Sequence, residues 1–297
     1  MNTSTGKILK GIGGFYYVKS FETDTVTECR ARGNFRKNGI KPYVGDNVLF
    51  SFDEDIEKGG YIVEILPRKN YFIRPPISNI DKLIIISAAV NPKPDYLYID
   101  KLTVICKYNN VEPVICINKT DMADTDELKE FVGTYQKTGY KVFTTSAKNG
   151  IGSDKLKNYI SGSVTAVSGF SGVGKSSLLN SIINENRFEV GDISNKLRRG
   201  KHTTRHVELI ECGDLIYLAD TPGFSMLELP DDITADNLSQ FFPEFEKYSS
   251  DCKFSSCNHL SNKFCAVCNA VCYGEITHTR YDNYKKLYNI LKEKKDW

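Results

Sequence analysis

The chain has little net charge, no long apolar run and no internal repeat. Its formal charge is only +2 at pH 7, so any affinity for nucleic acid must come from local clusters rather than from the field of the whole chain. No apolar stretch approaches the roughly 18 residues that a membrane span needs, and the first residues, MNTSTGKILKGIGG, lack the apolar core of a signal peptide. We therefore expect a soluble, cytoplasmic protein that does not contact a membrane.

The 297 residues, 40% hydrophobic and 26% charged, fit about two ordinary globular domains or three small ones. Residues 1–72 contain short strand patterns at 14–20, 25–33, 46–52 and 61–67, which predict a small antiparallel barrel or sandwich. Over 73–230, apolar strands alternate with helices at 96–108, 124–139 and 153–160 and with a long helix after residue 174, which predicts an α/β sheet. Residues 231–297 are mostly helical and contain a cysteine cluster.

A glycine-rich loop follows the strand SVTAVS and opens a helix, which is the setting of a phosphate-binding loop. Backbone N–H groups of such a loop and of the helix start hold phosphate oxygens. Lys175 would lie against the β and γ phosphates, the Ser176 hydroxyl would ligate Mg²⁺, and Ser177 would approach the α phosphate. The loop consists of Gly169, Phe170, Ser171, Gly172, Val173, Gly174, Lys175 and Ser176.

Two further motifs select the base. The tetrad Asn118-Lys119-Thr120-Asp121 follows the buried strand VEPVICI, and the Asp121 carboxylate can accept hydrogen bonds from guanine N1–H and its amine, which adenine cannot supply. The Lys119 stem would cover the base plane. Ser146-Ala147-Lys148 resembles the second guanine motif, with the Ala147 N–H donating to guanine O6. An ATP-using P-loop enzyme is the alternative, and Asp121 disfavours it.

The two switch segments follow the phosphate loop. Asp220-Thr221-Pro222-Gly223 matches the motif that holds Mg²⁺ through water and contacts the γ phosphate through the Gly223 N–H. Phe224 stands where many GTPases place a glutamine that orients the attacking water, and a phenyl ring cannot polarise water. Hydrolysis therefore needs another group or a partner.

The basic segment 198–205 occupies the place of the first switch. His202 is the best local candidate to orient water, and Thr203 or Thr204 would complete the Mg²⁺ shell, with Thr204 preferred. The alternative is a solvated basic loop whose histidine has no catalytic part.

The base tetrad precedes the phosphate loop, whereas ordinary GTP-binding domains have the opposite order. The chain is thus expected to be a circularly permuted GTPase. Its new ends fall before DKLIIIS and after DTPGF, which attaches the flanking domains close to the second switch.

Five of the nine cysteines lie near the C-terminus. Cys252, Cys257, His259 and Cys265 offer four soft ligands, typical of a closed, structural zinc site. Cys268 and Cys272 compete as ligands, but they share a helical face with Cys265 that is expected to be buried. Cys106 and Cys116 lie in apolar surroundings and are expected in the core.

Along nearly its whole length the chain resembles the RsgA family, the small ribosomal subunit biogenesis GTPases of bacteria. The resemblance rests on the permuted motif order and on GIGGFYYV, ECRARGNFRKNGIKPYVGD, ILPRKNYFIRPP, GKHTT, DTPGF and CKFSSCNHLSNKFCAV. It implies an N-terminal OB barrel (1–72), a permuted GTPase domain (73–230) and a C-terminal zinc domain (231–297).

The resemblance also implies binding near the decoding region of the immature 30S subunit, ribosome-stimulated GTP hydrolysis and departure after hydrolysis. The family's histidine at the position of His202 is assigned to hydrolysis. The family switch usually continues with a third threonine, where this chain has Arg205, so the choice between Thr203 and Thr204 stays open.

A basic cluster in the barrel loops supports an RNA partner, here 16S rRNA, although a solvated loop is the alternative. The cluster comprises Arg30, Arg32, Arg36, Lys37 and Lys41, beside Tyr43.

Tyr281, Tyr284 and Tyr288 share a helical stripe, which favours core packing over base stacking. We expect a monomer that uses GTP and GDP with Mg²⁺ and one structural Zn²⁺. A second hypothesis is a nucleotide-dependent RNA-binding module in which hydrolysis is incidental.

Overall fold

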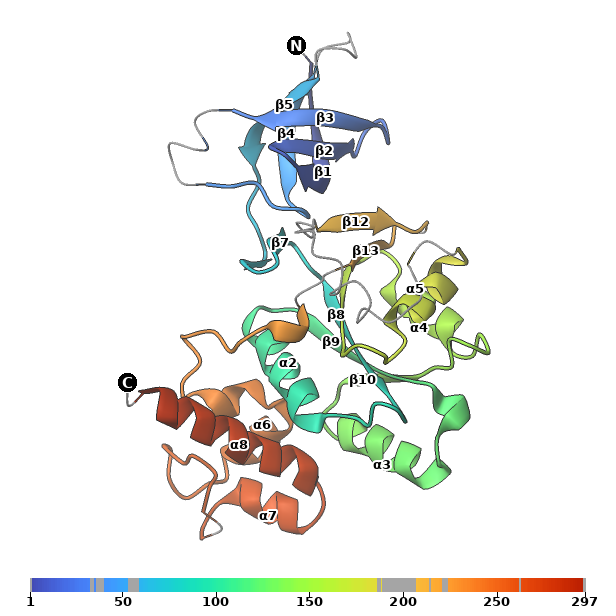
Figure 1. Cartoon of the computed structure of the whole chain (residues 1–297). Helices are drawn as coiled ribbons and strands as arrows, with labels where there is room; N and C mark the ends of the chain where they lie inside the picture. Colours follow the sequence, from blue (N-terminus) through green and yellow to red (C-terminus); the bar gives the residue numbers. More distant parts are fainter. Residues whose placement is uncertain are drawn as a thin grey trace, which may run out of the picture. The chain divides into compact units, whose positions relative to one another are not determined.

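The computed structural model describes residues 2–32, 35, 40–52, 59–185, 188, 207–213, 215–220, 224–261 and 263–295 (Figure 1). The chain forms two compact units, and neither is a single continuous segment. The first comprises Met1–Leu83, Asn158–Ser168 and Gly191–Met226, and the second comprises Ile84–Lys157, Gly169–Val190 and Leu227–Trp297. No helix in the described part of the chain is both long and apolar enough to cross a membrane.

A closed five-stranded barrel dominates the first unit. Its strands pair in the order β1-β2-β3-β5-β4 and back to β1, with β3 and β5 parallel and the other pairs antiparallel. This order is that of an OB fold and confirms the predicted barrel. The strands are β1 (Asn2–Ile12), β2 (Phe15–Ser20), β3 (Val26–Ala31), β4 (Asn47–Phe52) and β5 (Gly60–Ile65).

Strand β1 is the longest of the barrel, and the sequence pattern did not reveal it. It pairs with both β2 and β4, and it carries Gly6 where β2 crosses closely. A Cβ at Gly6 would lie 2.4 Å from the Lys19 carbonyl oxygen, so only glycine fits there.

A small sheet continues the first unit. Strand β11 (Val164–Ser168) pairs in parallel with β13 (Tyr217–Asp220), which pairs antiparallel with β12 (Glu208–Glu211). Strand β12 also lies antiparallel to barrel strand β1, with Lys10 opposite Glu208. The hairpin of β6 (Tyr71–Phe72) and β7 (Ile77–Ser78) and the short helix η4 (Phe224–Met226) complete the unit. Strand β12 was not predicted.

The second unit contains strands in the order β10-β9-β8, with β9 and β10 parallel. Cys106 and Cys116 are both fully buried here, as expected. The predicted helices are present, but α5 is shorter than expected because Asn184 ends it in the left-handed conformation. The elements are β8 (Lys82–Ala88), α2 (Tyr96–Tyr108), β9 (Glu112–Asn118), η2 (Thr120–Met122), α3 (Thr125–Gln136), β10 (Lys141–Thr144), α4 (Ser153–Ile160) and α5 (Lys175–Ile183).

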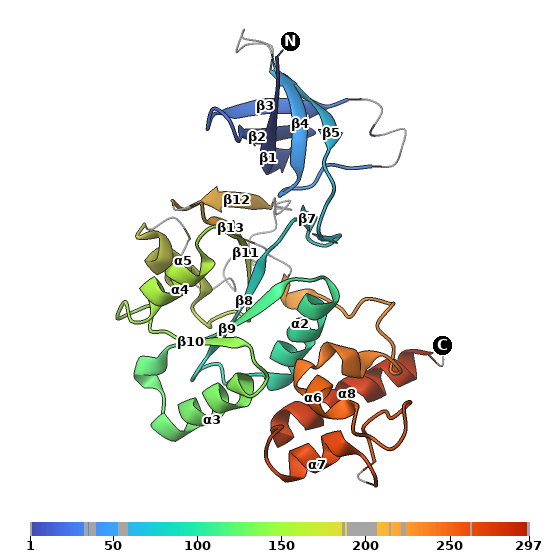
Figure 2. The same ribbon diagram turned by 180° about the vertical axis from the view of Figure 1, so that it is seen from behind.

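The C-terminal helices belong to the same unit and pack around one apolar core (Figure 2). Val104 of α2 is part of this core, so the C-terminal segment and α2 bury their apolar faces together. Tyr281, Tyr284 and Tyr288 are buried in it, which confirms core packing. The elements are η5 (Leu238–Phe241), α6 (Pro243–Ser249), α7 (Ala266–Cys272) and α8 (His278–Lys295).

A buried polar network also joins α8 to α2. The Arg280 guanidinium donates to Asp100 at 2.6 Å and to Glu244 at 2.7 Å, and all three side chains are nearly inaccessible to solvent. Asn283 and Tyr135 donate further hydrogen bonds to Asp100, at 2.7 Å and 3.0 Å. A second bond joins Arg280 to Glu244 at 3.2 Å, so each buried charge makes at least two hydrogen bonds, as burial of an ion requires.

Candidate nucleotide site and metal centre

The glycine-rich loop connects β11 to α5, as the sequence predicted. Gly172 and Gly174 have φ angles of 81° and 90°, which favour glycine. A Cβ at Gly169 would lie 2.4 Å from the Ile86 carbonyl oxygen. The Lys175 ammonium folds over the loop and donates to the carbonyls of Gly169 and Phe170 at 2.8 Å and 2.7 Å. Since the first N–H groups of a helix lack intrahelical acceptors, the start of α5 can bind an anion.

Asn118 holds the three nucleotide motifs of the second unit together. Its Nδ2 donates to the Val173 carbonyl in the phosphate loop at 3.0 Å. Its Oδ1 accepts from the Thr145 hydroxyl and from the Ala147 N–H, each at 3.1 Å. The side chain is buried, so these contacts fix the spacing between the phosphate loop and the base motifs.

The Asp121 carboxylate, which would read the base, lies beside Ser146. The Ser146 hydroxyl donates to Asp121 Oδ1 at 2.6 Å, and this hydrogen bond lowers the pKa of Asp121 below its usual value. Coulombic attraction by Lys148 and Lys119 acts in the same direction. The exposed carboxylate is thus ionised at neutral pH and can only accept hydrogen bonds.

Lys119 and Thr120 are also fixed locally. Lys119 adopts a left-handed backbone with φ of 62°, and its ammonium donates to the Asn91 carbonyl at 2.6 Å. The Thr120 hydroxyl donates to the Thr145 carbonyl at 3.0 Å. The tetrad and the Ser-Ala-Lys motif therefore form one connected surface. The Ala147 N–H, expected to donate to guanine O6, donates here to Asn118 instead.

The remaining switch predictions lie outside the described residues: His202, Thr203, Thr204 and Gly223. For Asp220, the structure gives its backbone at the end of β13, opposite Glu208. Phe224 is fully buried, and its ring lies 5.1 Å from that of Phe72. The ring therefore packs in the core of the first unit.

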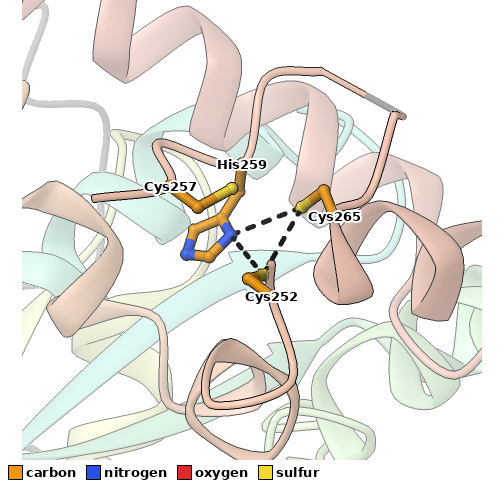
Figure 3. Close-up of side chains that lie close together, drawn as sticks. All are labelled: Cys252, Cys257, His259 and Cys265. Atoms are coloured by element: carbon orange, nitrogen blue, oxygen red, sulfur yellow. Dashed lines mark hydrogen bonds between the residues drawn. The ribbon is translucent and has the colours of Figure 1, made fainter. Parts of the chain in front are cut away.

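Cys252, Cys257, His259 and Cys265 point toward one another (Figure 3), and their ligand atoms all lie within 4.8 Å of one another. His259 Nδ1 is 3.6 Å from Cys252 Sγ and 3.5 Å from Cys265 Sγ, and those two sulfurs are 3.9 Å apart. Tetrahedral zinc with Zn–S of about 2.3 Å and Zn–N of about 2.0 Å spaces its ligands by about 3.5 to 3.8 Å. The geometry and the donor set both fit zinc.

The titration of these side chains also suits a metal. Burial lowers the pKa of His259, which keeps its imidazole neutral. Burial raises the pKa of the Cys257 and Cys265 thiols to about 11 in the absence of a cation. A bound cation reverses this preference because it stabilises the thiolate.

The competing cysteines have other environments. Cys268 is buried, and its sulfur lies 3.2 Å from the Tyr281 hydroxyl and 3.4 Å from the His259 carbonyl. Cys272 is exposed on α7. Neither belongs to the four-residue cluster.

Tyr281 and Tyr284 of α8 hold the loop that carries the candidate zinc ligand His259, a role that the sequence did not reveal. Tyr281 donates to the His259 carbonyl at 2.9 Å, and Tyr284 donates to the Asn258 carbonyl at 2.7 Å. His259 has a left-handed backbone with φ of 55°, which these bonds help to hold. Their helical spacing predicted burial, but the direction of their hydroxyls depends on the fold.

Two family models cover most of the chain. The RsgA N-terminal domain matches residues 5–62, and the RsgA GTPase matches residues 65–230. The small ribosomal subunit biogenesis GTPase RsgA of Ruminiclostridium cellulolyticum is 45% identical over 97% of this chain and 94% of its own length. That of Caldanaerobacter subterraneus subsp. tengcongensis is 44% identical over 99% of this chain and 98% of its own length.

Two solved structures have the same fold as this chain. YjeQ from Thermotoga maritima superposes with a TM-score of 0.83 at 35% identity and covers 98% of this chain and 99% of its own. YloQ, described as a circularly permuted GTPase, gives a TM-score of 0.83 at 37% identity and covers 99% of this chain and 96% of its own. These matches confirm the fold class and the permuted order. The chain therefore belongs to the RsgA family and is a circularly permuted GTPase.

Proposed function

We propose that this GTPase binds the 30S ribosomal subunit in the cytoplasm, acts in its late maturation, hydrolyses GTP with ribosome stimulation and then dissociates. The observation that carries the proposal is the Asn118 junction, which joins a phosphate loop to two guanine motifs. The names of the relatives, small ribosomal subunit biogenesis GTPases, support the choice of the small subunit as partner.

The chain is proposed to act as a monomer with three functional regions: a barrel (1–72), a GTPase domain (73–230) and a zinc domain (231–297). In the GTPase domain, Lys175 and the loop amides bind the phosphates, and Asp121 selects guanine. Ser176, Thr204 and Asp220 would hold Mg²⁺, which neutralises phosphate charge when bound. The zinc cluster is structural, since four protein ligands leave no open position.

The barrel offers a surface for 16S rRNA. Arg68 lies over the rings of Tyr43 and Tyr71, at 4.4 Å and 5.6 Å, and Arg30 lies over Phe15 at 4.6 Å. Cationic side chains beside aromatic rings are typical of surfaces that contact unpaired bases and phosphates. Lys41, nearby in sequence, adds exposed positive charge.

The deciding experiment measures GTP turnover with and without purified 30S subunits. We expect turnover to rise at least about tenfold, as when a partner completes a GTPase site. Replacement of His202 by alanine should abolish the stimulation, whereas replacement of His206, its sequence neighbour, should not. Absence of stimulation in the unaltered protein at saturating GTP would overturn the proposal.

A second function is a nucleotide-dependent RNA-binding module with incidental hydrolysis. The burial of Phe224 favours it, because this position supplies no group to orient water. A His202→Ala protein that releases from 30S subunits at the normal rate with GTP would favour this second function.

A further inference from the structure

The β6–β7 hairpin contacts the residue that follows the DTPG motif. Phe72 of β6 and Phe224 of η4 are 6% and 0% exposed, and their ring centroids are 5.1 Å apart with planes inclined at 51°. Phe224 stands where a water-orienting glutamine is common in GTPases. In this chain the position therefore supplies an apolar contact to a hairpin outside the nucleotide motifs.

The hairpin has two different faces. Successive side chains of a strand point to opposite sides, and Tyr71 is 51% exposed while its neighbour Phe72 is buried. The Tyr71 ring lies 6.3 Å from that of Tyr43 and within 5.6 Å of the Arg68 guanidinium. One face of β6 thus belongs to the barrel surface, and the other packs on Phe224.

The open end of the hairpin is firmly attached to the barrel. Ser78 of β7 donates from its hydroxyl to Asp46 at 2.6 Å and from its N–H to the Val44 carbonyl at 2.9 Å. Asp46 is fully buried and also accepts two hydrogen bonds from Arg68, at 2.7 Å and 2.8 Å. The loop before β4 and the hairpin are therefore locked together by a charged, desolvated contact.

The chain immediately after the hairpin is attached to β11 of the sheet formed by β11, β13 and β12. Asp81 follows β7, and its N–H donates to the Val164 carbonyl while its carboxylate accepts from the Val164 N–H, each at 2.8 Å. Val164 begins β11, the strand that leads into the phosphate loop. The open end of the hairpin is thus held both to the barrel and to β11, and a shift of the barrel surface would be passed to Phe72.

We infer that Phe72 is a positioning residue for the GTPase reaction: it ties the second switch, through Phe224, to the RNA-facing surface of the barrel. RNA contact at the barrel would then change the packing of Phe72 on Phe224 and reach the switch by a path of direct contacts. This inference rests on the proposed binding of the small subunit. In this inference Phe224, at the position where many GTPases have a glutamine, transmits the state of the barrel surface to the second switch.

The test compares Phe72→Ala and Phe72→Leu with Phe21→Ala, a control at an exposed barrel phenylalanine. For each protein, turnover at saturating GTP is measured with saturating 30S subunits and without them, and the ratio is compared. We expect Phe72→Ala to lower the ratio about tenfold, a typical coupling between two protein sites. Phe72→Leu, which refills most of the volume, should recover part of it, and Phe21→Ala should keep it.

Equilibrium binding separates coupling from loss of structure. GTP affinity, zinc content and affinity for 30S subunits with a non-hydrolysable GTP analogue should stay within about threefold of the unaltered protein, because Phe72 contacts none of these ligands in the proposal. An unchanged ratio in Phe72→Ala would overturn the inference. If Phe72→Ala does not fold, Phe224→Leu provides the same comparison from the other side of the contact. Failure of the proposed function is distinguishable, because the unaltered protein itself would then show no stimulation.

Discussion

At the scale of single residues, the nucleotide site depends on a few close contacts that leave no room for change. The amide of Asn118 lies directly beside Gly174, where an added Cβ would be 2.4 Å from its Nδ2. Gly174 also has a φ of 90°. The glycine therefore serves both the turn and the contact with the base motif.

We expect Gly174→Ala to weaken GTP binding about tenfold or more, because backbone strain and the clash with Asn118 both oppose the bound geometry. Binding of a fluorescent GTP analogue would measure this. Gly139→Ala is the matched control, since Gly139 has a φ of 82° but open space around its Cβ. Equal losses in the two proteins would show that backbone strain acts by destabilising the fold, and that the Asn118 contact is not responsible.

Asp121→Asn should weaken GTP binding about 30- to 150-fold, because an amide presents donors to the guanine donors and leaves them unpaired. Xanthosine triphosphate, which has a carbonyl in place of the exocyclic amine, should bind better to this protein than to the unaltered one. Competition between the two nucleotides measures both effects. Unchanged preference for GTP would exclude Asp121 from base recognition.

The pH dependence of binding follows from the same carboxylate. The Ser146 hydrogen bond lowers the pKa of Asp121, so the carboxylate stays ionised at all pH values above that lowered pKa. Guanine affinity should therefore be flat from pH 8 to pH 5 and fall only in stronger acid. Ser146→Ala should move the fall to higher pH, which titrations of binding would detect.

At the scale of elements, α2 and α8 are joined by charge as well as by apolar packing. Arg280→Met should destabilise the protein by about 3–5 kcal/mol, because Asp100 and Glu244 would be left buried without their cation. Urea unfolding would measure the change. Lys292→Met, at an exposed position of α8, is the control and should change stability by less than about 0.5 kcal/mol. A loss below about 1 kcal/mol for Arg280→Met would contradict the assignment.

Cysteines inside and outside the proposed zinc site can be compared directly. Cys257→Ser should abolish zinc binding and reduce stability by about 3 kcal/mol or more, because metal binding contributes to folding. Cys272→Ser, at an exposed cysteine outside the cluster, should do neither. Metal analysis and amide hydrogen exchange would test this, and exchange should also rise in α2, which shares the core. Zinc retained by Cys257→Ser would point to another ligand.

Elements with a strong local signal could be predicted from the sequence, and those fixed by distant partners could not. The phosphate loop and the base motifs are recognisable because their chemistry needs fixed residues at fixed spacing. Strand β1 has no clear alternation, since Gly6 and several polar residues interrupt it, and its closure on β4 decides its conformation. The Arg280 network was missed for a related reason: Asp100 and Glu244 are far from Arg280 in sequence.

At the scale of the whole molecule, the low net charge means that the proposed RNA binding would depend on a local basic surface. Each of Arg32→Ala and Lys41→Ala should reduce the salt dependence of 30S binding, lowering the slope of log K against log salt by about 1. Lys129→Ala, at an exposed position of α3, is the control and should leave the slope unchanged. Binding at four salt concentrations suffices. If the slope of log K against log salt is the same in all of these proteins, Arg32 and Lys41 of the barrel loops do not contact the 30S subunit.

The pairing of β1 with β12 sets an order for synthesis. The barrel strands all lie within the first 65 residues and can close as soon as they leave the ribosome, whereas Lys10 meets Glu208 only after nearly 200 more residues have been made. Contacts between such distant segments form slowly. The finished barrel therefore presents the part of β1 beyond Lys7, which β4 does not pair, as an edge on which the last strands of the GTPase sheet assemble. A nascent chain that stops before β12 cannot complete that sheet, so the permuted gene order makes nucleotide hydrolysis one of the last properties that this protein acquires.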